Sequence, residues 1–296
     1  MKNVIHSLVA VAGLATVANA QVANTLLKYE VSRDGVNWSS TLNANPGDTI
    51  QVRALASYIG SASAPTAGGL GQIVFQPVVS SWTGADTLIT TAGTPGNNGV
   101  GPVGGTRSTP IGTVEDAPGQ YGRITPFGAN STTTSTYLRG HVGTGTAAGL
   151  LRIARADVTN WIGVGATSGA SAANNWNGGG GVSIAQIANP NRLTSDPAFN
   201  ANTSNVVVFK FGFTLSSATD VRTLNITTPA GGIGKVTTPG SEYGEQNARW
   251  FASTQEVSSS LRGGVNVMDA AVSIVPAPAS LALLGLGGLV AARRRR

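Results

Sequence analysis

Few residues of this chain could act as a base or a nucleophile, and their spacing assembles no catalytic set. The sequence has two histidines, His6 and His141, and no cysteine. His141 lies in YLRGHVGTG, which no G-x-S-x-G turn precedes, and one histidine cannot form an H-E-x-x-H zinc site. We interpret His141 as a loop or strand-end residue. The absence of cysteine excludes thiolate chemistry and disulfides, and we expect no metal or other cofactor.

Two carboxylate pairs are close in the sequence: Glu115 with Asp116, and Glu242 with Glu245. Glycoside hydrolases need two carboxyl groups about 5 to 10 Å apart. Thirteen acidic residues spread along the chain produce such neighbours by chance, so solvated loop positions explain both pairs. We therefore predict that the protein is not an enzyme. A secreted hydrolase that uses a carboxylate pair is the alternative from the enzyme class.

The five tryptophans are the residues best suited to binding a ligand: Trp38, Trp82, Trp161, Trp176 and Trp250. Core packing is the usual fate of tryptophan, but exposed indole rings can stack on sugar rings. Trp176 lies in the loop-like SGASAANNWNGGGG and is expected to be the most exposed. Trp38 and Trp82 are the other two candidates for glycan stacking. An alternative function is therefore a carbohydrate-binding module on extracellular polysaccharide.

The basic isoelectric point, about 10.1, does not indicate a nucleic-acid partner. Of the 19 basic residues, Lys2 lies near the N-terminus and four arginines, Arg293–Arg296, lie at the C-terminus. Removal of these five leaves 14 basic against 13 acidic residues. A nearly neutral body with scattered charges has no basic surface for a phosphate backbone. We therefore expect no nucleic acid among the partners.

The first twenty residues, MKNVIHSLVAVAGLATVANA, have the three parts of a secretory signal peptide. Lys2 provides the positive start, Val4–Val17 an apolar helix, and Ala18-Asn19-Ala20 a small-x-small cleavage site with Ala18 and Ala20 at its small positions. Cleavage by signal peptidase after Ala20 would leave Gln21 as the mature N-terminus. The apolar stretch is short for a permanent membrane span. The alternative is a buried N-terminal helix of the domain.

Residues 21–274 show short apolar runs between Gly, Pro, Asn and Asp, which predict strands and turns. Leu26–Ser32 and Val36–Leu42 flank Arg33-Asp34-Gly35, a tight hairpin turn. Val221–Thr227 is expected to pair with Asn205–Leu215. The other expected strands are Ile50–Tyr58, Gln72–Val79, Leu150–Val158 and a closing strand at Val265–Ile274.

The strand Asn205–Leu215 has the clearest alternation. Its core face carries Val207, Phe209, Phe211, Phe213 and Leu215, and its partly polar outer face carries Lys210 and Thr214. Residues 84–148 and Ser168–Gly181 look like long loops at the rim of the domain. The fold class expected is all-β: a β-sandwich with long Gly/Thr/Asn-rich loops.

Two resemblances concern the body of the chain, residues 21–274. PGDTIQVRALASY, VVVFKFGFTL and the closing strand resemble secreted cohesin-like or carbohydrate-binding-module-like β-sandwiches. SRDGVNW, Ser32–Trp38, is similar to the Asp-box hairpins of sialidase-like propellers. It is one residue shorter than that pattern and occurs once, whereas propellers repeat it, so we interpret the segment as a plain hairpin with an Asp-Gly turn.

The tail, residues 275–296, has three parts: Val275-Pro276-Ala277-Pro278, an uncharged stretch Ala279–Ala292, and Arg293, Arg294, Arg295 and Arg296. The fourteen uncharged residues would form a helix of about 21 Å, shorter than a hydrocarbon core of about 30 Å. The arginines would stay on the cytoplasmic side. The apolar side chains that would lie in the membrane belong to Ala279, Leu281, Leu283, Leu284, Leu286, Leu289 and Val290.

This order resembles the PEP-CTERM sorting signal, with Ala277 where that motif usually has Glu. The resemblance implies that the chain is the substrate of an exosortase-type membrane protease or transpeptidase. It also implies a non-enzymatic protein that is tethered transiently to the inner membrane and then moves to the cell surface or the exopolysaccharide matrix. The alternative is a simple C-terminal membrane anchor.

Overall fold

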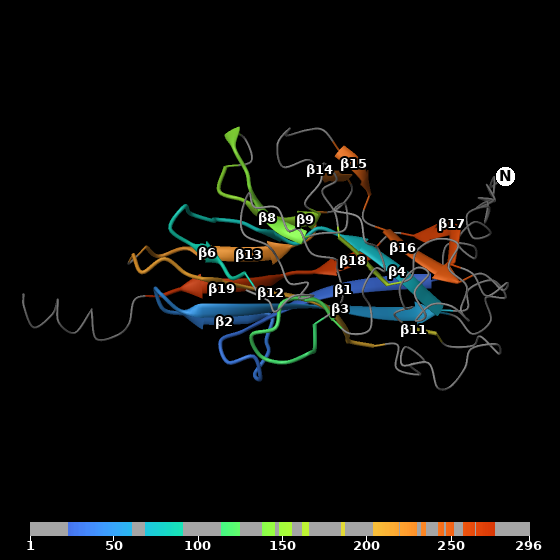
Figure 1. The fold of residues 1–296 in the computed structure, drawn as a ribbon, viewed down its shortest axis with the longest axis horizontal. Helices are drawn as coiled ribbons and strands as arrows, with labels where there is room; N and C mark the ends of the chain where they lie inside the picture. Colours follow the sequence, from blue (N-terminus) through green and yellow to red (C-terminus); the bar gives the residue numbers. More distant parts are fainter. Residues whose placement is uncertain are drawn as a thin grey trace, which may run out of the picture.

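The computed structural model describes residues 23–60, 69–90, 114–124, 138–145, 148–155, 162–165, 185–186, 204–218, 220–229, 232–234, 242–245, 247–251, 257–263 and 265–275. Both terminal segments, with the helices expected in them, and the loop at 168–181 lie outside these ranges. Within them the chain forms strands and turns without an α-helix. The prediction of an all-β sandwich is confirmed (Figure 1).

One layer of the sandwich is the first sheet, whose strand order is β18-β1-β3-β12-β6, with β7 also paired to β12. The bounds are β1 (Ala23–Ser32), β3 (Thr49–Gly60), β6 (Thr87–Leu88), β7 (Gly122–Arg123), β12 (Val206–Thr214) and β18 (Val265–Met268). The long central strands are antiparallel, whereas β18 runs parallel to β1.

The second sheet has the order β2-β19-β13-β5-β9-β8. Its strands are β2 (Thr41–Ala44), β5 (Val78–Val79), β8 (Leu138–Val142), β9 (Leu151–Arg155), β13 (Thr223–Thr227) and β19 (Ala270–Ile274). The third sheet, β10-β4-β16-β17 with β11 on β4, consists of β4 (Gly69–Phe75), β10 (Ile162–Gly165), β11 (Ala185–Gln186), β16 (Asn247–Phe251) and β17 (Val257–Gly263). A separate pair joins β14 (Gly232–Gly234) to β15 (Glu242–Glu245).

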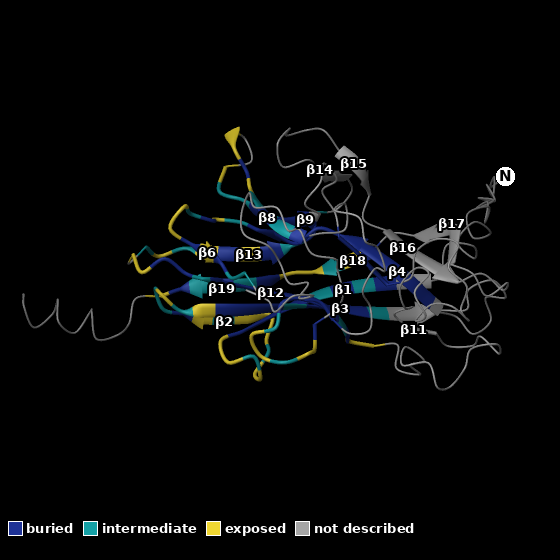
Figure 2. Ribbon diagram, in the orientation of Figure 1, coloured by how far each residue is buried: buried dark blue, intermediate teal, exposed yellow. Residues whose placement is uncertain are grey.

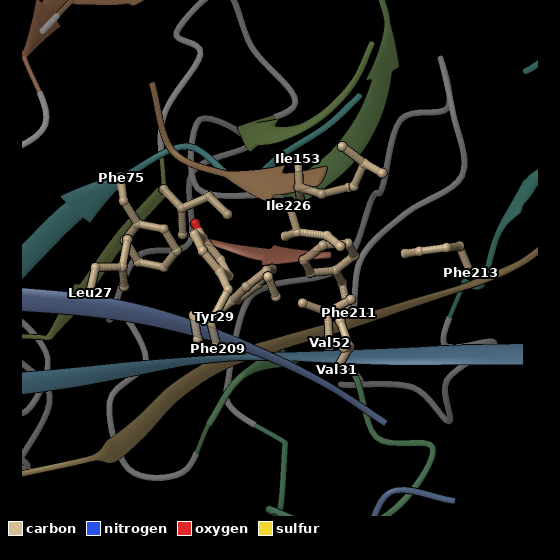
Figure 3. Packing of buried hydrophobic residues seen from close by; sticks show 14 of the residues in the cluster. Leu27, Tyr29, Val31, Val52, Phe75, Ile153, Phe209, Phe211, Phe213 and Ile226 are labelled. Atoms are coloured by element: carbon tan, nitrogen blue, oxygen red, sulfur yellow. The ribbon is translucent and has the colours of Figure 1, made fainter. Parts of the chain in front are cut away.

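The core lies between the first sheet and the other two, and Figure 2 shows it as a continuous buried band. Period-two alternation sends every second side chain of the long strands inward. Phe209 packs edge-to-face against Phe75, with ring centroids 6.1 Å apart. Figure 3 shows this contact and the packing of β1, β3 and β12 against Ile153 and Ile226 of the second sheet. Each such buried side chain contributes about 1.5–3 kcal/mol.

The expectation of a strand from Val36 to Leu42 is wrong for most of that range. After β1 the chain bends from Arg33 to Asn37, forms one isolated antiparallel bridge between Ser39 and Val31, and enters β2 only at Thr41. β2 does not return along β1 but pairs in parallel with β19 in the second sheet. The loop thus crosses from one layer to the other after a single bridge between Val31 and Ser39, and the Asp34 carboxylate binds the amides of Val36 and Asn37.

Three other expected strands have different partners or bounds. The segment Val221–Thr227 contains β13, which pairs with β19 and β5 and not with β12. Gln72–Val79 divides into β4 and β5, which belong to different sheets and are separated by Gln76 and Pro77. Leu150–Val158 is described as β9, up to Arg155.

The closing strand Val265–Ile274 is shared between the two layers. β18 pairs with β1 in the first sheet, and after Asp269 the chain continues as β19 in the second sheet. Such a switch lets one segment join both layers at an edge of the sandwich. The region expected to be loop-like, 84–148, also contributes β6, β7 and β8.

The pattern expected for β12 holds from Phe209 to Leu215 but fails at its start. A register shift lies between Val207 and Phe209, and Val208 is fully buried. A bulge adds one residue to a strand and changes which face the preceding side chain occupies. Val207 is therefore only half-buried. Lys210, expected on a partly polar outer face, is 1% exposed, because residues 114–120 cover that face.

Candidate functional site

Five side chains gather on the outer face of the first sheet: Glu30, Trp38, Arg53, Asp116 and Lys210, which we call the Trp38 cluster. The sheet register aligns three of them, since Glu30 of β1 lies opposite Arg53 of β3 and Arg53 lies opposite Lys210 of β12. Trp38 comes from the loop after β1, and Asp116 from the segment before β7. Two loops thus complete a row that three strands begin.

The Asp34 carboxylate organises the loop that carries Trp38. Its Oδ1 accepts hydrogen bonds from the backbone amides of Val36 and Asn37, both at 2.8 Å, and from the Ser32 hydroxyl, also at 2.8 Å. Its Oδ2 accepts one from the Asn37 side-chain amide at 2.6 Å. The bonds from Asn37 and Val36, followed by those from the two side chains, hold the pKa of Asp34 well below its ordinary value.

Gly35 and Trp38 complete this turn. Gly35 has φ +73°, and a Cβ there would lie 2.7 Å from the Gln51 side chain, so glycine is required by both conformation and space. The Trp38 indole N–H donates to the Gly35 carbonyl at 3.2 Å. This bond folds the indole back over the sheet. The interpretation of SRDGVNW as a hairpin turn agrees with the two backbone hydrogen bonds between Val31 and Ser39 that close the segment, and Asp34 organises the turn inside it.

The Trp38 ring lies over two cations. The Arg53 guanidinium is 4.5 Å from the ring centroid and the Lys210 ammonium is 5.9 Å from it. Because Arg53 and Lys210 are neighbours on the outer face of the sheet, the indole covers them. Trp38 is partly exposed. A cation beneath an indole contributes about 0.5–2 kcal/mol.

The charges of the cluster are paired. Arg53 donates from Nε and Nη2 to Glu30 at 2.8 and 2.6 Å, and the Lys28 ammonium lies 2.6 Å from the other Glu30 oxygen. Burial alone would raise the pKa of Glu30, but the bonds from Lys28 and Arg53 outweigh it and lower that pKa. Glu30 is therefore ionised at neutral pH and holds Arg53 in place.

Lys210 is satisfied by the segment that covers it. Its ammonium donates to the Ala117 carbonyl at 2.7 Å and to the Asp116 carboxylate at 3.1 Å. The segment is fixed in turn by the amide of Gly119, which donates to Gln51 at 3.0 Å. A buried ammonium needs such partners because desolvation of an unpaired charge is costly.

This arrangement suits recognition better than proton transfer. The two acids of the Trp38 cluster bind cations and do not face one another. A flat indole bordered by paired charges and amides can stack on a ring and hydrogen-bond its hydroxyl groups. Within the described part of the chain, no three His, Cys, Asp or Glu side chains come together as a metal site.

The other two tryptophans proposed for glycan stacking differ in outcome. Trp82 is 5% exposed, and its ring packs edge-to-face on Phe213 with centroids 5.7 Å apart. Its proposed stacking on sugar is a wrong prediction, because the core of the sandwich covers it. Trp176 and Trp161 lie outside the described residues. Trp250 lies on β16, where only the backbone is described.

The residues considered for catalysis are separate in the structure. His141 lies on β8 opposite Arg152 of β9. Glu115 is exposed beside Asp116, whose carboxylate is bound to Lys210. Glu242 and Glu245 lie at the two ends of β15, and their side chains lie outside the described residues.

A second ion pair fixes the end of the sandwich where β19 terminates. Asp86 accepts hydrogen bonds from the Arg222 guanidinium at 2.5 and 2.8 Å, from the Ser216 amide at 2.9 Å and from the Thr83 amide at 2.8 Å. Burial alone would raise the pKa of Asp86, but the bonds from Arg222, Thr83 and Ser216 lower it. The pair ties the loop before β6 to the loop between β12 and β13.

Of the proposed sorting and cleavage residues, the structure describes only Val275. Its amide donates to the Ala44 carbonyl at 2.9 Å, so the last residue before Pro276 is still part of the fold. Ala18, Ala20 and residues 276–296 lie outside the described ranges. Among the residues that the structure does describe, no helix is long and apolar enough to cross a membrane.

Arg53 and Lys210 were not identified from the sequence as partners of Trp38. One signal was present, since each is a lone charge within an otherwise apolar strand. Their alignment depends on the pairing of β3 with β12, which alternation within one strand does not specify. The covering segment, residues 114–120, has the sequence of a loop, and nothing in that sequence predicts that it lies over β12.

The described fold is a β-sandwich with a surface suited to binding. No protein-family model matches the sequence, and no curated protein is similar to it. The solved structures that resemble the fold include the seventh ScaB type I cohesin from Pseudobacteroides cellulosolvens, at 8% identity and a TM-score of 0.35, covering 85% of this chain and 94% of that one.

Two others are also cohesins. One belongs to a type I cohesin–dockerin complex from Clostridium thermocellum, with 7% identity, a TM-score of 0.33, and coverage of 86% of this chain and 99% of that one. The other is a type III cohesin module from a cell-surface anchoring scaffoldin of Ruminococcus flavefaciens, with 10% identity, a TM-score of 0.30, and coverage of 90% and 94%. At these values the comparisons transfer no partner and no activity, so the proposals below rest on this chain's own residues.

Proposed function

We propose that this chain is an exported, non-enzymatic protein of the cell surface or exopolysaccharide matrix. The N-terminal segment directs export, and an exosortase-type enzyme processes the tail near Pro276-Ala277-Pro278. Residues 21–274, the body of the chain, are the part that these two segments direct to its destination. It acts by binding, because the chemical groups on its described surface are arranged as a recognition face.

One observation supports this proposal: the described fold begins and ends next to the two expected processing positions. β1 begins at Ala23, two residues after Gln21, the expected mature N-terminus. β19 ends at Ile274, and Val275 makes the last backbone hydrogen bond before the prolyl motif. Cleavage at either place would therefore leave every described strand intact. A processing position that lies outside the described strands suits a signal that is removed.

The experiment is intact-mass spectrometry of the protein exported by its native cell. We expect a mature form that begins at Gln21 and ends near Pro278, and a form that retains Arg296 in cells without the exosortase. A secreted protein that retains Arg296 in normal cells would contradict tail processing. Recovery of that form from the membrane fraction would favour the simple anchor instead.

A second candidate function, binding of extracellular polysaccharide, is supported by the position of Trp38. The indole lies over the Arg53 guanidinium and near the Lys210 ammonium, and it is partly exposed. We expect Trp38→Ala to reduce retardation in polysaccharide-containing gels about tenfold, since aromatic stacking contributes about 0.5–1.5 kcal/mol beyond area burial. Val36→Ala, at a 70% exposed neighbour in the same loop, is the matched control. Equal retardation of wild type and Trp38→Ala would exclude this role for Trp38.

A further inference from the structure

The end of the sandwich where β19 terminates carries an exposed apolar pair, Val221 and Val275. Their side chains are 72% and 40% exposed. β13 and β19 are antiparallel with Thr223 opposite Ser273, and the Ile274 amide donates to the Arg222 carbonyl at 2.8 Å. This register, continued by one more residue, places Val221 opposite Val275. The two valines thus form one small apolar patch.

The patch is held on a well-braced surface. The Asp86–Arg222 ion pair fixes the residue next to Val221. The Gly47 amide donates to the Ser216 carbonyl at 3.0 Å, and the Val275 amide donates to the Ala44 carbonyl at 2.9 Å. The loops at this end are therefore joined to one another.

Chain length limits how far this end can lie from the apolar tail segment. Only Pro276, Ala277 and Pro278 separate Val275 from Ala279, the first residue of that segment. Four extended steps span at most about 14 Å. The polar headgroup region on each side of a bilayer is about 5–8 Å thick. While Ala279–Ala292 is held in a membrane, Val275 must lie at or near the headgroup layer.

We propose that the Val221–Val275 patch contacts the lipid headgroup layer while the tail is retained. This inference rests on the membrane-tethered stage of the proposed function. Because β18 and β19 run in the direction of β1, Ala23 lies at the opposite end of the sandwich (Figure 1). The sandwich then stands on the membrane with its long strands pointing away, and its N-terminal end is outermost.

The cysteine-free sequence permits a direct test with single labels. Val221→Cys reports on the patch. Asn266→Cys is the matched exposed control, nine residues before Val275 and roughly 30 Å away along extended chain. The full chain from Gln21 to Arg296 is reconstituted in phosphatidylcholine–phosphatidylglycerol vesicles and labelled with an environment-sensitive fluorophore. Co-flotation with the vesicles is measured first, and then quenching by nitroxide-headgroup lipid.

We expect the chain to float with the vesicles and the Val221 label to be quenched several-fold more than the Asn266 label. Co-flotation with equal quenching would overturn the contact but leave membrane retention intact. Failure to float would overturn retention and the contact together. Ala218→Cys, also exposed at this end, is a second reporter if Val221→Cys folds poorly. A chain ending at Val275 should show no quenching at either site.

Discussion

Lys210 shows how a charged residue can be buried on the outer face of a sheet. Its side chain is 1% exposed, whereas that of Asp116, its partner, is 47% exposed. The pair is therefore asymmetric: one member depends entirely on protein partners and the other still reaches water. Removal of Asp116 leaves a buried ammonium, whereas removal of Lys210 leaves a carboxylate that still reaches water.

We predict that Asp116→Ala destabilises the protein more than Lys210→Met does. Loss of Asp116 leaves a buried ammonium with the Ala117 carbonyl as its remaining hydrogen-bond acceptor, which costs about 1–3 kcal/mol. Lys210→Met keeps the volume and removes the charge, and replacement of a buried ion pair by an apolar group is often close to neutral. Urea unfolding of both variants measures the difference. An equal loss of stability in both variants would indicate that the Lys210 side chain contributes only its packing and not its charge.

At the scale of elements, residues 114–121 cover the outer face of β12 before the chain joins the edge of that strand as β7. Ala117 lies above Lys210, and the Tyr121 ring lies against Gly212. The fit is close, because a Cβ at Gly212 would lie 2.5 Å from the Tyr121 ring. Tyr121 is 3% exposed, and burial raises its pKa. The Tyr121 ring can lie here because Gly212 has no side chain.

We predict that Gly212→Ala lowers the free energy of unfolding by about 1–3 kcal/mol, the usual cost of overpacking. Gly84→Ala is the matched control, since a Cβ there meets nothing within 4 Å, and should change stability by about 0.5 kcal/mol or less. Chemical denaturation compares the two. The double variant Gly212→Ala/Tyr121→Leu should recover part of the loss, and an additive loss would contradict the proposed contact.

At the scale of the whole molecule, ion pairs at different places join loops to strands and the two layers to each other. Glu30 holds the Trp38 cluster on the first sheet, and Asp86 holds the end where β19 terminates. Both have lowered pKa values in the folded state. A lowered carboxyl pKa stabilises the fold above the unfolded value, and this contribution is lost as pH falls through the folded value.

We therefore predict that these two carboxylates contribute a constant stability between about pH 5 and pH 7, and that stability falls progressively as the pH drops below the ordinary values of 4.5 for Glu and 3.8 for Asp. Thermal unfolding followed by circular dichroism from pH 7 to pH 2 measures this loss. Asp86→Asn should be less stable at neutral pH and should show a shallower decline in acid. An unchanged acid profile in that variant would show that Asp86 does not contribute.

The sequence by itself determined the fold class and most of the long strands. Period-two alternation in Ile50–Ala56 and Phe209–Leu215 specifies a buried face because it is a local property of the chain. The turn and strand signals between them ruled out long helices. The same local patterns defined the two terminal segments, which stay predictions until their processing is measured.

Only the tertiary structure decided which strands pair and what covers them. β2 joins the second sheet after a single bridge between Val31 and Ser39, and Asp269 separates β18 from β19, which join different layers. The Trp38 cluster exists because β1, β3 and β12 align Glu30, Arg53 and Lys210 in one row. Pairing energies depend on residues far apart in the chain, so alternation within one strand cannot specify them.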